Sequence, residues 1–297
     1  LVAAASSTQD PLTPRFVLSY HPDHDNLIYA SAAKGYRPGG VNSSLGDVCT
    51  SSLQAIGLAA APTTFSQDSL WSYELGSKNT LFDRRVQVDA SVYVIDWKGI
   101  QQNVYLLACG LQFTANLGAA RSVGGDIHVQ VRPVDNLLVD MTAARTDAKY
   151  TQTICGGALA CTGSGAVSKP IVSAGDHLPA APWSFILSGE YGLPGFHERD
   201  PYVRFDYHYS TAQTDLLSGQ NPNNGVADTT IPGLPTSSTL ALRAGLRWSG
   251  IDVSIYGQNL ANSHPLLFDT RDTTASPLYF DRSTRPRTIG VTASYRY

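Results

Sequence analysis

The chain has few charged residues, a single methionine and no long apolar run. Only 15% of its 297 residues are charged, whereas an ordinary soluble domain has roughly 25%. Its 21 basic and 24 acidic residues leave no basic excess, which argues against a nucleic-acid partner. No stretch approaches the ~18 to 20 apolar residues of a transmembrane helix. If the chain crosses a membrane, it must therefore do so with strands.

Sequence signatures of catalysis and cofactor binding are also missing. The chain contains no Gly-x-Ser-x-Gly elbow, no Gly-x-x-x-x-Gly-Lys-Ser/Thr loop and no Gly-x-Gly-x-x-Gly fingerprint. His21, Asp23, His24 and Asp25 lie close together and have the side chains of metal ligands. With Pro22, however, they are also ordinary turn residues. We therefore expect no enzyme, no cofactor and no bound metal.

What the sequence does have is a repeated alternation of apolar and polar residues. Val86, Val88 and Val92 are apolar, whereas Gln87 and Asp89 are polar. A period of two predicts strands with one apolar and one wet face. Eleven such strands are predicted, near Arg15–Tyr20, Asn26–Tyr36, Leu70–Leu81, Arg85–Leu107, Leu111–Arg132, Leu137–Tyr150, Leu178–Gly192, Tyr202–Thr214, Thr236–Trp248, Ile251–Leu260 and Arg285–Tyr297.

The connections between these strands alternate between short turns and long polar loops. The long loops are Pro38–Asp68, Thr151–His177, Asp215–Pro235 and Ser263–Thr284. One connection in the long-loop series, at Cys109, is a tight turn instead. Outer-membrane barrels have this asymmetry, with short periplasmic turns and long outer loops, and Trp and Tyr near the strand ends fit interfacial girdles. The sequence therefore predicts an all-β fold, an antiparallel up-and-down transmembrane β-barrel. A soluble sandwich or propeller is the alternative.

Five short motifs follow one another along the chain. They are Tyr29–Asn42 (YASAAKGYRPGGVN), Ser72–Lys78 (SYELGSK), Val92–Gln101 (VYVIDWKGIQ), Asn116–Asp126 (NLGAARSVGGD) and Gln258–Leu260 (QNL), followed by a last strand that ends on an aromatic residue. In sequence and in order, these motifs resemble those of TonB-dependent outer-membrane receptors. Each motif is weak alone, but together they cover essentially the whole chain.

The resemblance implies a 22-stranded barrel that is filled by an N-terminal plug. Eleven strands running to the C-terminus would form the second half of this barrel. Residues 1–297 are therefore expected to be a single partial domain, without the plug and the TonB box. The odd strand count and Leu1 in place of an initiating Met fit a fragment.

By resemblance, the parent receptor lies in the outer membrane of a Gram-negative bacterium and takes up a large scarce nutrient, most often a ferric siderophore. The expected partners are outer-membrane lipid, the TonB energising complex through the missing N-terminal part, the barrel insertion machinery and the ferric siderophore or a similar ligand. The alternatives are a passive porin-like channel and a secreted soluble all-β carbohydrate-binding protein.

Candidate substrate contacts come from the polar faces of the predicted strands and from the outer mouth. Each has a structural alternative, because wide lumens are lined with charges as a rule and the Pro38–Gly40 turn alone explains the residues around it. The candidates are Tyr36, Arg37, Glu74, His208, Arg243 and Gln258.

In the implied topology all four cysteines lie on the outer side. We expect Cys155 to pair with Cys161 within one loop and Cys49 to pair with Cys109 between two loops. Disulfides persist in oxidising compartments and lower the entropy of mobile surfaces. Four unrelated thiols are the alternative.

The last strand resembles the sorting signal of outer-membrane barrels. It alternates up to Tyr295 and the terminal Tyr297, and the insertion machinery would recognise this end. The alternative is an ordinary edge strand.

Overall fold

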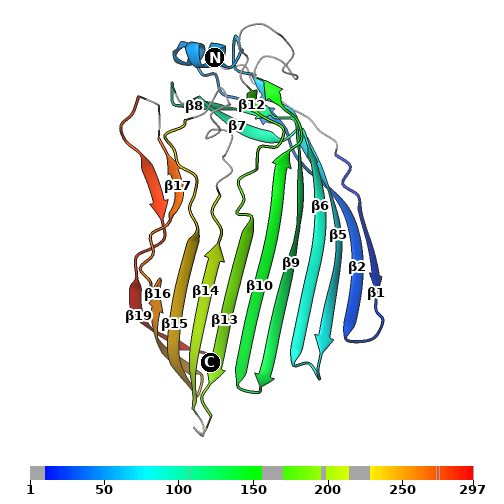
Figure 1. Ribbon diagram of the computed structural model, residues 1–297, viewed down its shortest axis with the longest axis vertical. Coiled ribbons are helices and arrows are strands. Elements are labelled where there is room, and N and C mark those ends of the chain that lie inside the picture. Colours follow the sequence, from blue (N-terminus) through cyan, green and yellow to red (C-terminus); the bar gives the residue numbers. More distant parts are fainter. Residues whose placement is uncertain are drawn as a thin grey trace.

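The computed structural model describes residues 11–106, 108–155, 170–194, 199–213, 228–271, 273 and 275–296. Its main feature is one sheet of eleven strands, in the order β1-β2-β5-β6-β9-β10-β13-β14-β15-β16-β19. All neighbours in it are antiparallel. Tight turns join the strands at one end, which we call the turn end, and α1 and the short strands gather at the other, the looped end (Figure 1).

The bounds of the sheet strands are β1 (Arg15–Tyr20), β2 (Asn26–Arg37), β5 (Asp68–Leu81), β6 (Val86–Lys98), β9 (Ala119–Val134), β10 (Leu137–Tyr150), β13 (Trp183–Gly192), β14 (Asp200–Ser210), β15 (Ser237–Trp248), β16 (Ile251–Gln258) and β19 (Thr288–Tyr295). The other elements are β3 (Gly40–Val41), η1 (Asp47–Cys49), α1 (Thr50–Ala55), β4 (Thr64–Phe65), β7 (Gln101–Leu106), β8 (Leu111–Asn116), β11 (Ile154–Cys155), β12 (Pro170–Val172), β17 (Leu266–Thr270) and β18 (Phe280–Ser283).

The predicted all-β antiparallel architecture is confirmed, but two predicted strands are too long. Arg85–Leu107 and Leu111–Arg132 each break in two, because β7 and β8 leave the main sheet and pair only with each other. The breaks fall at Gly99 and Gly118, whose φ angles of 63° and 67° lie in the left-handed region that glycine adopts without strain. Apolar residues recur at every second position from Leu111 to Ala119, across Gly118, so alternation did not reveal that β8 leaves the sheet.

Two further bounds differ for local reasons. The predicted strand Leu178–Gly192 begins at Trp183 instead, because Pro179 and Pro182 have no N–H to donate to the ladder. The predicted loop Ser263–Thr284 contains the hairpin of β17 and β18.

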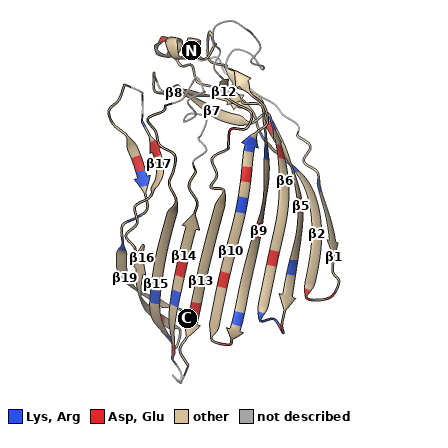
Figure 2. Ribbon diagram, viewed as in Figure 1, with Lys and Arg blue, Asp and Glu red and all other residues tan. Residues whose placement is uncertain are grey.

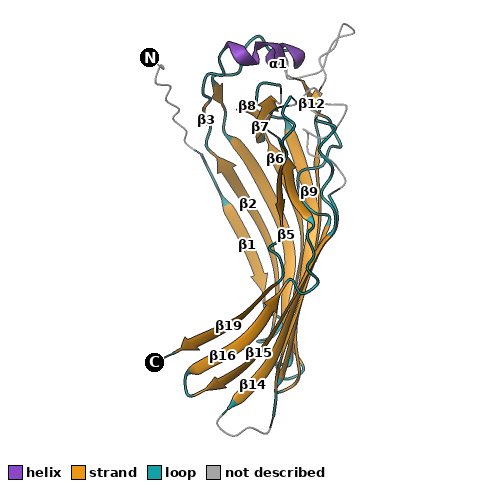
Figure 3. Cartoon of the chain, turned by 90° about the vertical axis from the view of Figure 1, so that its left-hand side faces the viewer, coloured by secondary structure: helices purple, strands orange, loops and turns teal. Residues whose placement is uncertain are grey.

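The register divides the side chains of the sheet between two faces. Glu74 pairs with Ser31 and Tyr93, and Tyr93 pairs with Gly124, so these residues share one face, which we call the polar face. Their chain neighbours form the apolar face, on which Leu75 is 55% exposed and Val291 is 70% exposed. Figure 3 shows the sheet from its edge. Among the described residues no helix is long and apolar enough to cross a membrane.

On the polar face, tyrosines pair with glycines across neighbouring strands. In four places a tyrosine ring covers the glycine directly opposite it on the next strand, so that a methyl group on the glycine would overlap the ring. Rings that cover strand glycines shield the exposed backbone and fix the register. The pairs are Tyr29–Gly76, Tyr93–Gly124, Tyr202–Gly245 and Tyr256–Gly290.

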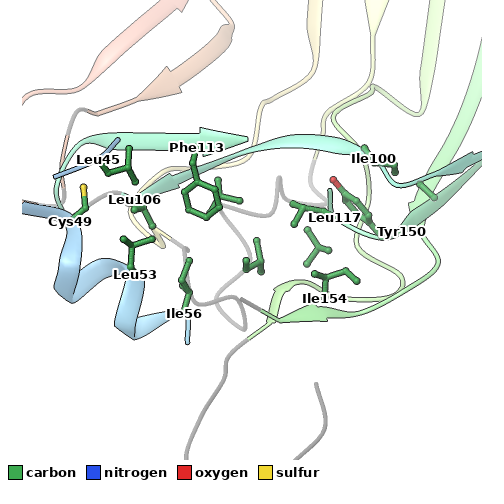
Figure 4. Close-up of a cluster of buried hydrophobic side chains, with 14 residues drawn as sticks. Leu45, Cys49, Leu53, Ile56, Ile100, Leu106, Phe113, Leu117, Tyr150 and Ile154 are labelled. Atoms are coloured by element: carbon green, nitrogen blue, oxygen red, sulfur yellow. The ribbon is translucent and has the colours of Figure 1, made fainter. Parts of the chain in front are cut away.

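The buried core of the described residues lies at the looped end and not within the sheet (Figure 4). Ala120 and Tyr150 belong to the polar face and to this cluster, so the loops fold over the polar face. The cluster is Leu45, Cys49, Leu53, Ile56, Ile100, Val104, Leu106, Phe113, Leu117, Ala120, Tyr150, Ile154, Ile171 and Val172.

Candidate functional site

A buried carboxylate fixes the loops at the looped end. Asp68 is 2% exposed, and it accepts hydrogen bonds from Arg37 Nε at 3.0 Å and from the Gln101 backbone N–H at 3.1 Å. Arg37 also donates to the Gln101 carbonyl at 3.0 Å and lies 4.8 Å from the Trp97 ring centroid. The predicted substrate contact Arg37 therefore joins β2, β5 and β7, which favours its structural interpretation.

Two asparagines tie further loop backbone together. Asn42 donates to the Thr114 carbonyl at 2.8 Å and accepts from the Thr114 N–H at 2.8 Å. Asn116 donates to the carbonyls of Gly99 at 2.6 Å and Ser66 at 3.0 Å. Sequence reasoning missed these contacts, and it missed Asp68, because they exist only once the hairpin of β7 and β8 leaves the sheet.

A disulfide completes this assembly. Cys49 and Cys109 are bonded, with an S–S distance of 2.01 Å, which is the pairing that we expected between two loops. Cys155 carries no free thiol, and its expected partner, Cys161, lies outside the described residues.

Two of the candidate substrate contacts come together in one pocket. His208, near the end of β14, and Gln258, at the end of β16, line a cavity of about 310 Å³ on the polar face. We call this cavity the outer pocket, since both side chains lie toward the looped ends of their strands. Its other lining residues are Asp206, Thr239, Leu240, Ala241, Asn259, Thr284, Arg285 and Pro286.

Asn259 shapes the rim of the outer pocket. Its φ is 48°, a left-handed conformation that Asn tolerates better than most residues. Its side-chain amide donates to the carbonyls of Ser263 and Arg285, both at 2.8 Å, and its carbonyl oxygen accepts from the Ser263 N–H at 2.9 Å. Asn259 therefore fastens both ends of the last loop, a role that its place in the QNL motif did not reveal.

The other candidates lie elsewhere. Arg243 faces Arg204 and Tyr256 across the sheet, and its guanidinium is 5.6 Å from the Tyr256 ring centroid. Glu74 accepts a hydrogen bond from the Tyr29 hydroxyl. Tyr36 is 40% exposed on the apolar face, away from the polar face, so its position does not suit a contact with a lumen substrate.

From the outer pocket toward the turn end, charges on the polar face neutralise one another. Arg247 lies 2.8 Å from Glu190 and 3.5 Å from Asp252, and Arg204 lies 2.6 Å from Asp206. On the next strands, His128 Nε2 is 2.8 Å from the carboxylate of Asp140. Figure 2 shows charged positions along these strands. This balanced network of charges suits a sheet face that is exposed to water.

The His21–Asp25 segment is a turn. The Asp23 carboxylate accepts from the Asp25 N–H at 2.9 Å and from the Asn26 amide at 2.7 Å, and these bonds lower the pKa of Asp23. Among the described residues there is no group of three or more His, Cys, Asp or Glu side chains that could hold a metal ion.

The two faces define a class of protein. A sheet that exposes Val, Leu, Ile and aromatic side chains on one face and a charged network on the other satisfies both environments when the apolar face meets lipid. Strands that are all antiparallel, with tight turns at one end and long loops at the other, are the wall of a transmembrane β-barrel.

The chain belongs to the family of TonB-dependent receptor-like β-barrels, whose sequence profile matches residues 3–260. It is similar to the ferric yersiniabactin uptake receptor of Yersinia pestis, with a TM-score of 0.65 and 14% identity over 94% of this chain and 36% of that one. It is also similar to a copper transporter, with a TM-score of 0.65 and 13% identity over 95% of this chain and 38% of that one. For the ferripyoverdine receptor of Pseudomonas aeruginosa, the TM-score is 0.61 and the identity is 12% over 95% of this chain and 32% of that one.

These similarities define the fold and the family. The chain spans 32 to 38% of the length of these three proteins. The family and its neighbours are outer-membrane receptors and transporters, not enzymes.

Proposed function

We propose that this chain is the C-terminal half of a receptor barrel in the outer membrane of a Gram-negative bacterium, and that the receptor takes up a ferric siderophore with energy supplied through TonB. The observation that carries the proposal is the outer pocket, which places His208 and Gln258 on the wet face near the looped end. Two of the similar structures are named for ferric ligands.

The direction of the edge strands supports a partial barrel. Ten antiparallel pairings connect β1 to β19, so these two strands run in the same direction. If the sheet closed on itself, or with a second copy in the same orientation, it would have parallel seams. Closure by antiparallel pairing alone requires an odd number of further strands. The other eleven strands of a 22-stranded barrel would provide such a number.

The remaining partners follow from this arrangement. The plug and the segment that engages the TonB complex would come from sequence N-terminal to these residues and fill the space beside the polar face. The insertion machinery would recognise the end of β19. There Tyr295 is 65% exposed on the apolar face, and Tyr297 lies outside the described residues.

The outer pocket has the chemistry to hold an anionic chelate. His208, Gln258, Thr239 and Arg285 offer hydrogen-bond donors, and the Asp206 carboxylate, which also lines the pocket, is paired with Arg204 at 2.6 Å. The cavity of about 310 Å³ lies at the small end of the range for ligand pockets. The donor groups would bind the oxygens of the chelate and leave the ligands of the iron in place.

The test uses the complete receptor in a strain that lacks other ferric-siderophore receptors. We expect His208→Ala combined with Gln258→Ala to weaken ferric siderophore binding about tenfold or more, because two polar contacts are lost. The matched control is His128→Ala, which removes a histidine from the same face toward the turn end. Equal binding by the pocket variant and the wild type would contradict the proposal, as would ion conductance by a receptor that neither binds nor transports the chelate.

A further inference from the structure

Charged side chains occur on the apolar face at one end only. Seven charged residues in the described part of the sheet belong to this face, and all lie toward the looped ends of β2, β6, β9 and β10. At the turn end no Lys, Arg, Asp or Glu of the eleven strands belongs to it. We call the seven residues the basic collar: Lys34, Asp96, Lys98, Arg121, Arg145, Asp147 and Lys149.

Most of the collar follows the border of the apolar band, whereas Arg145 lies further in, in the row of Gly125, Val92 and Leu75. Lys34, Trp71, Asp96, Arg121 and Lys149 are direct neighbours across five adjacent strands. The row two residues nearer the turn end is mostly apolar. It consists of Ala32, Tyr73, Val94, Val123 and Asp147.

The collar has more positive than negative charge. Its five cations face two carboxylates, although the whole chain has a net charge of −3. Arg121 Nε lies 2.6 Å from Asp96 and Lys149 Nζ lies 3.0 Å from Asp147, yet the Arg121 side chain is still 58% exposed. Among the described residues, Lys34 and Lys98 form no ion pair.

We propose that the basic collar binds the phosphate groups of a phosphorylated lipid in the outer leaflet, whose acyl chains lie on the apolar band below. Lys and Arg place their stems on apolar surface and their charged heads at the headgroup level, and guanidinium groups hold phosphate oxygens in pairs. Trp71 and Tyr73, which stack at 5.9 Å, suit the same interfacial depth. The inference rests on the membrane placement proposed above but not on the cargo.

The experiment measures lipid binding by the complete receptor in detergent, by native mass spectrometry with bis-phosphorylated lipid A. We expect Arg121→Gln with Lys149→Gln to weaken binding about tenfold, because two charge-assisted contacts are lost. Lys34→Gln with Lys98→Gln breaks no ion pair among the described residues and is expected to act in the same direction. The control, Arg84→Gln with Arg132→Gln, removes the same charge near the turn end and is expected to leave binding unchanged.

Three results would overturn the inference: equal affinity in both collar variants and the wild type, equal affinity for a dephosphorylated lipid, or full competition by inorganic phosphate at the same phosphate concentration. Ferric siderophore binding is measured on the same samples and is expected to be unaffected by the collar variants. If the wild type binds the lipid but no ferric siderophore, the proposed cargo fails while the collar inference holds.

Discussion

The hydroxyl of Tyr29 donates a hydrogen bond to the carboxylate of Glu74, and its ring covers Gly76 on the neighbouring strand. A Cβ atom at Gly76 would lie 2.5 Å from the Tyr29 ring, closer than atoms pack. The two contacts fix the side chain of Tyr29 on the polar face. The hydrogen bond to Tyr29 gives Glu74 a structural role, which is independent of any substrate.

Gly76→Ala is therefore expected to destabilise the barrel by about 1 to 3 kcal/mol, the usual cost of overpacking. The measurement is the unfolding temperature of the complete receptor in detergent. Gly35→Ala is the matched control, because the nearest atom to its Cβ would be 3.7 Å away in Leu70. A Gly76 variant as stable as the Gly35 variant would contradict the packing described for Tyr29.

The disulfide between Cys49 and Cys109 closes a separation of 60 residues. Loop-closure entropy for that length corresponds to about 4 kcal/mol as an upper figure. Cys49→Ser with Cys109→Ser is expected to speed proteolysis at α1 and in the hairpin of β7 and β8, while the eleven sheet strands stay intact. Unchanged proteolysis would show that the apolar cluster alone holds the loops.

Asp228 is expected to make the last loops sensitive to acid. Burial alone would raise the pKa of Asp228, but bonds from Arg271 Nε at 2.5 Å and the Thr230 hydroxyl at 2.6 Å outweigh burial and lower it. A lowered carboxyl pKa stabilises the fold above the unfolded pKa of about 4 and loses that contribution as the pH falls through the folded value. Amide exchange at Thr230, corrected for intrinsic rates, is expected to change little from pH 7 to 5 and to accelerate below about pH 4. Asp228→Asn is expected to exchange fast throughout, and a variant that behaves like the wild type would contradict this assignment.

Asp269 is expected to have the opposite pH dependence. Burial and the facing carboxyl of Asp281 raise the pKa of Asp269. A raised carboxyl pKa favours the folded state as the pH falls through the folded value, so the hairpin of β17 and β18 gains stability on mild acidification. Asp269→Asn is expected to slow amide exchange in this hairpin at pH 7. Faster exchange in that variant would contradict a repulsion between the carboxyl groups of Asp269 and Asp281.

Alternation alone predicted the eleven strands and their two faces, because Val86 to Val94 and the last strand repeat with a clean period of two. It did not predict the looped end. The hairpin of β7 and β8 turns out of the sheet at two glycines, and the contacts of Asp68, Asn42 and Asn116 depend on that turn. In the outer pocket, alternation placed His208 and Gln258 on the polar face, but Arg285 and Asn259 join them only through the closure of the last loop. Tyr36 shows the reverse case, since it lies at the looped end of β2, as its position beside Arg37 suggested, but the register places it on the apolar face.

The most direct test of the account is the accessibility of spin labels along β6 in the complete receptor in membranes. Labels replacing Val88, Val92 and Val94 are expected to be exposed to oxygen in lipid, and labels replacing Gln87, Asp89 and Ser91 to a water-soluble nickel chelate. The described residues contain no free cysteine that would compete for labelling. Alternating accessibility with a period of two is the predicted result. Labels that all respond alike would contradict a wall with lipid on one side and water on the other.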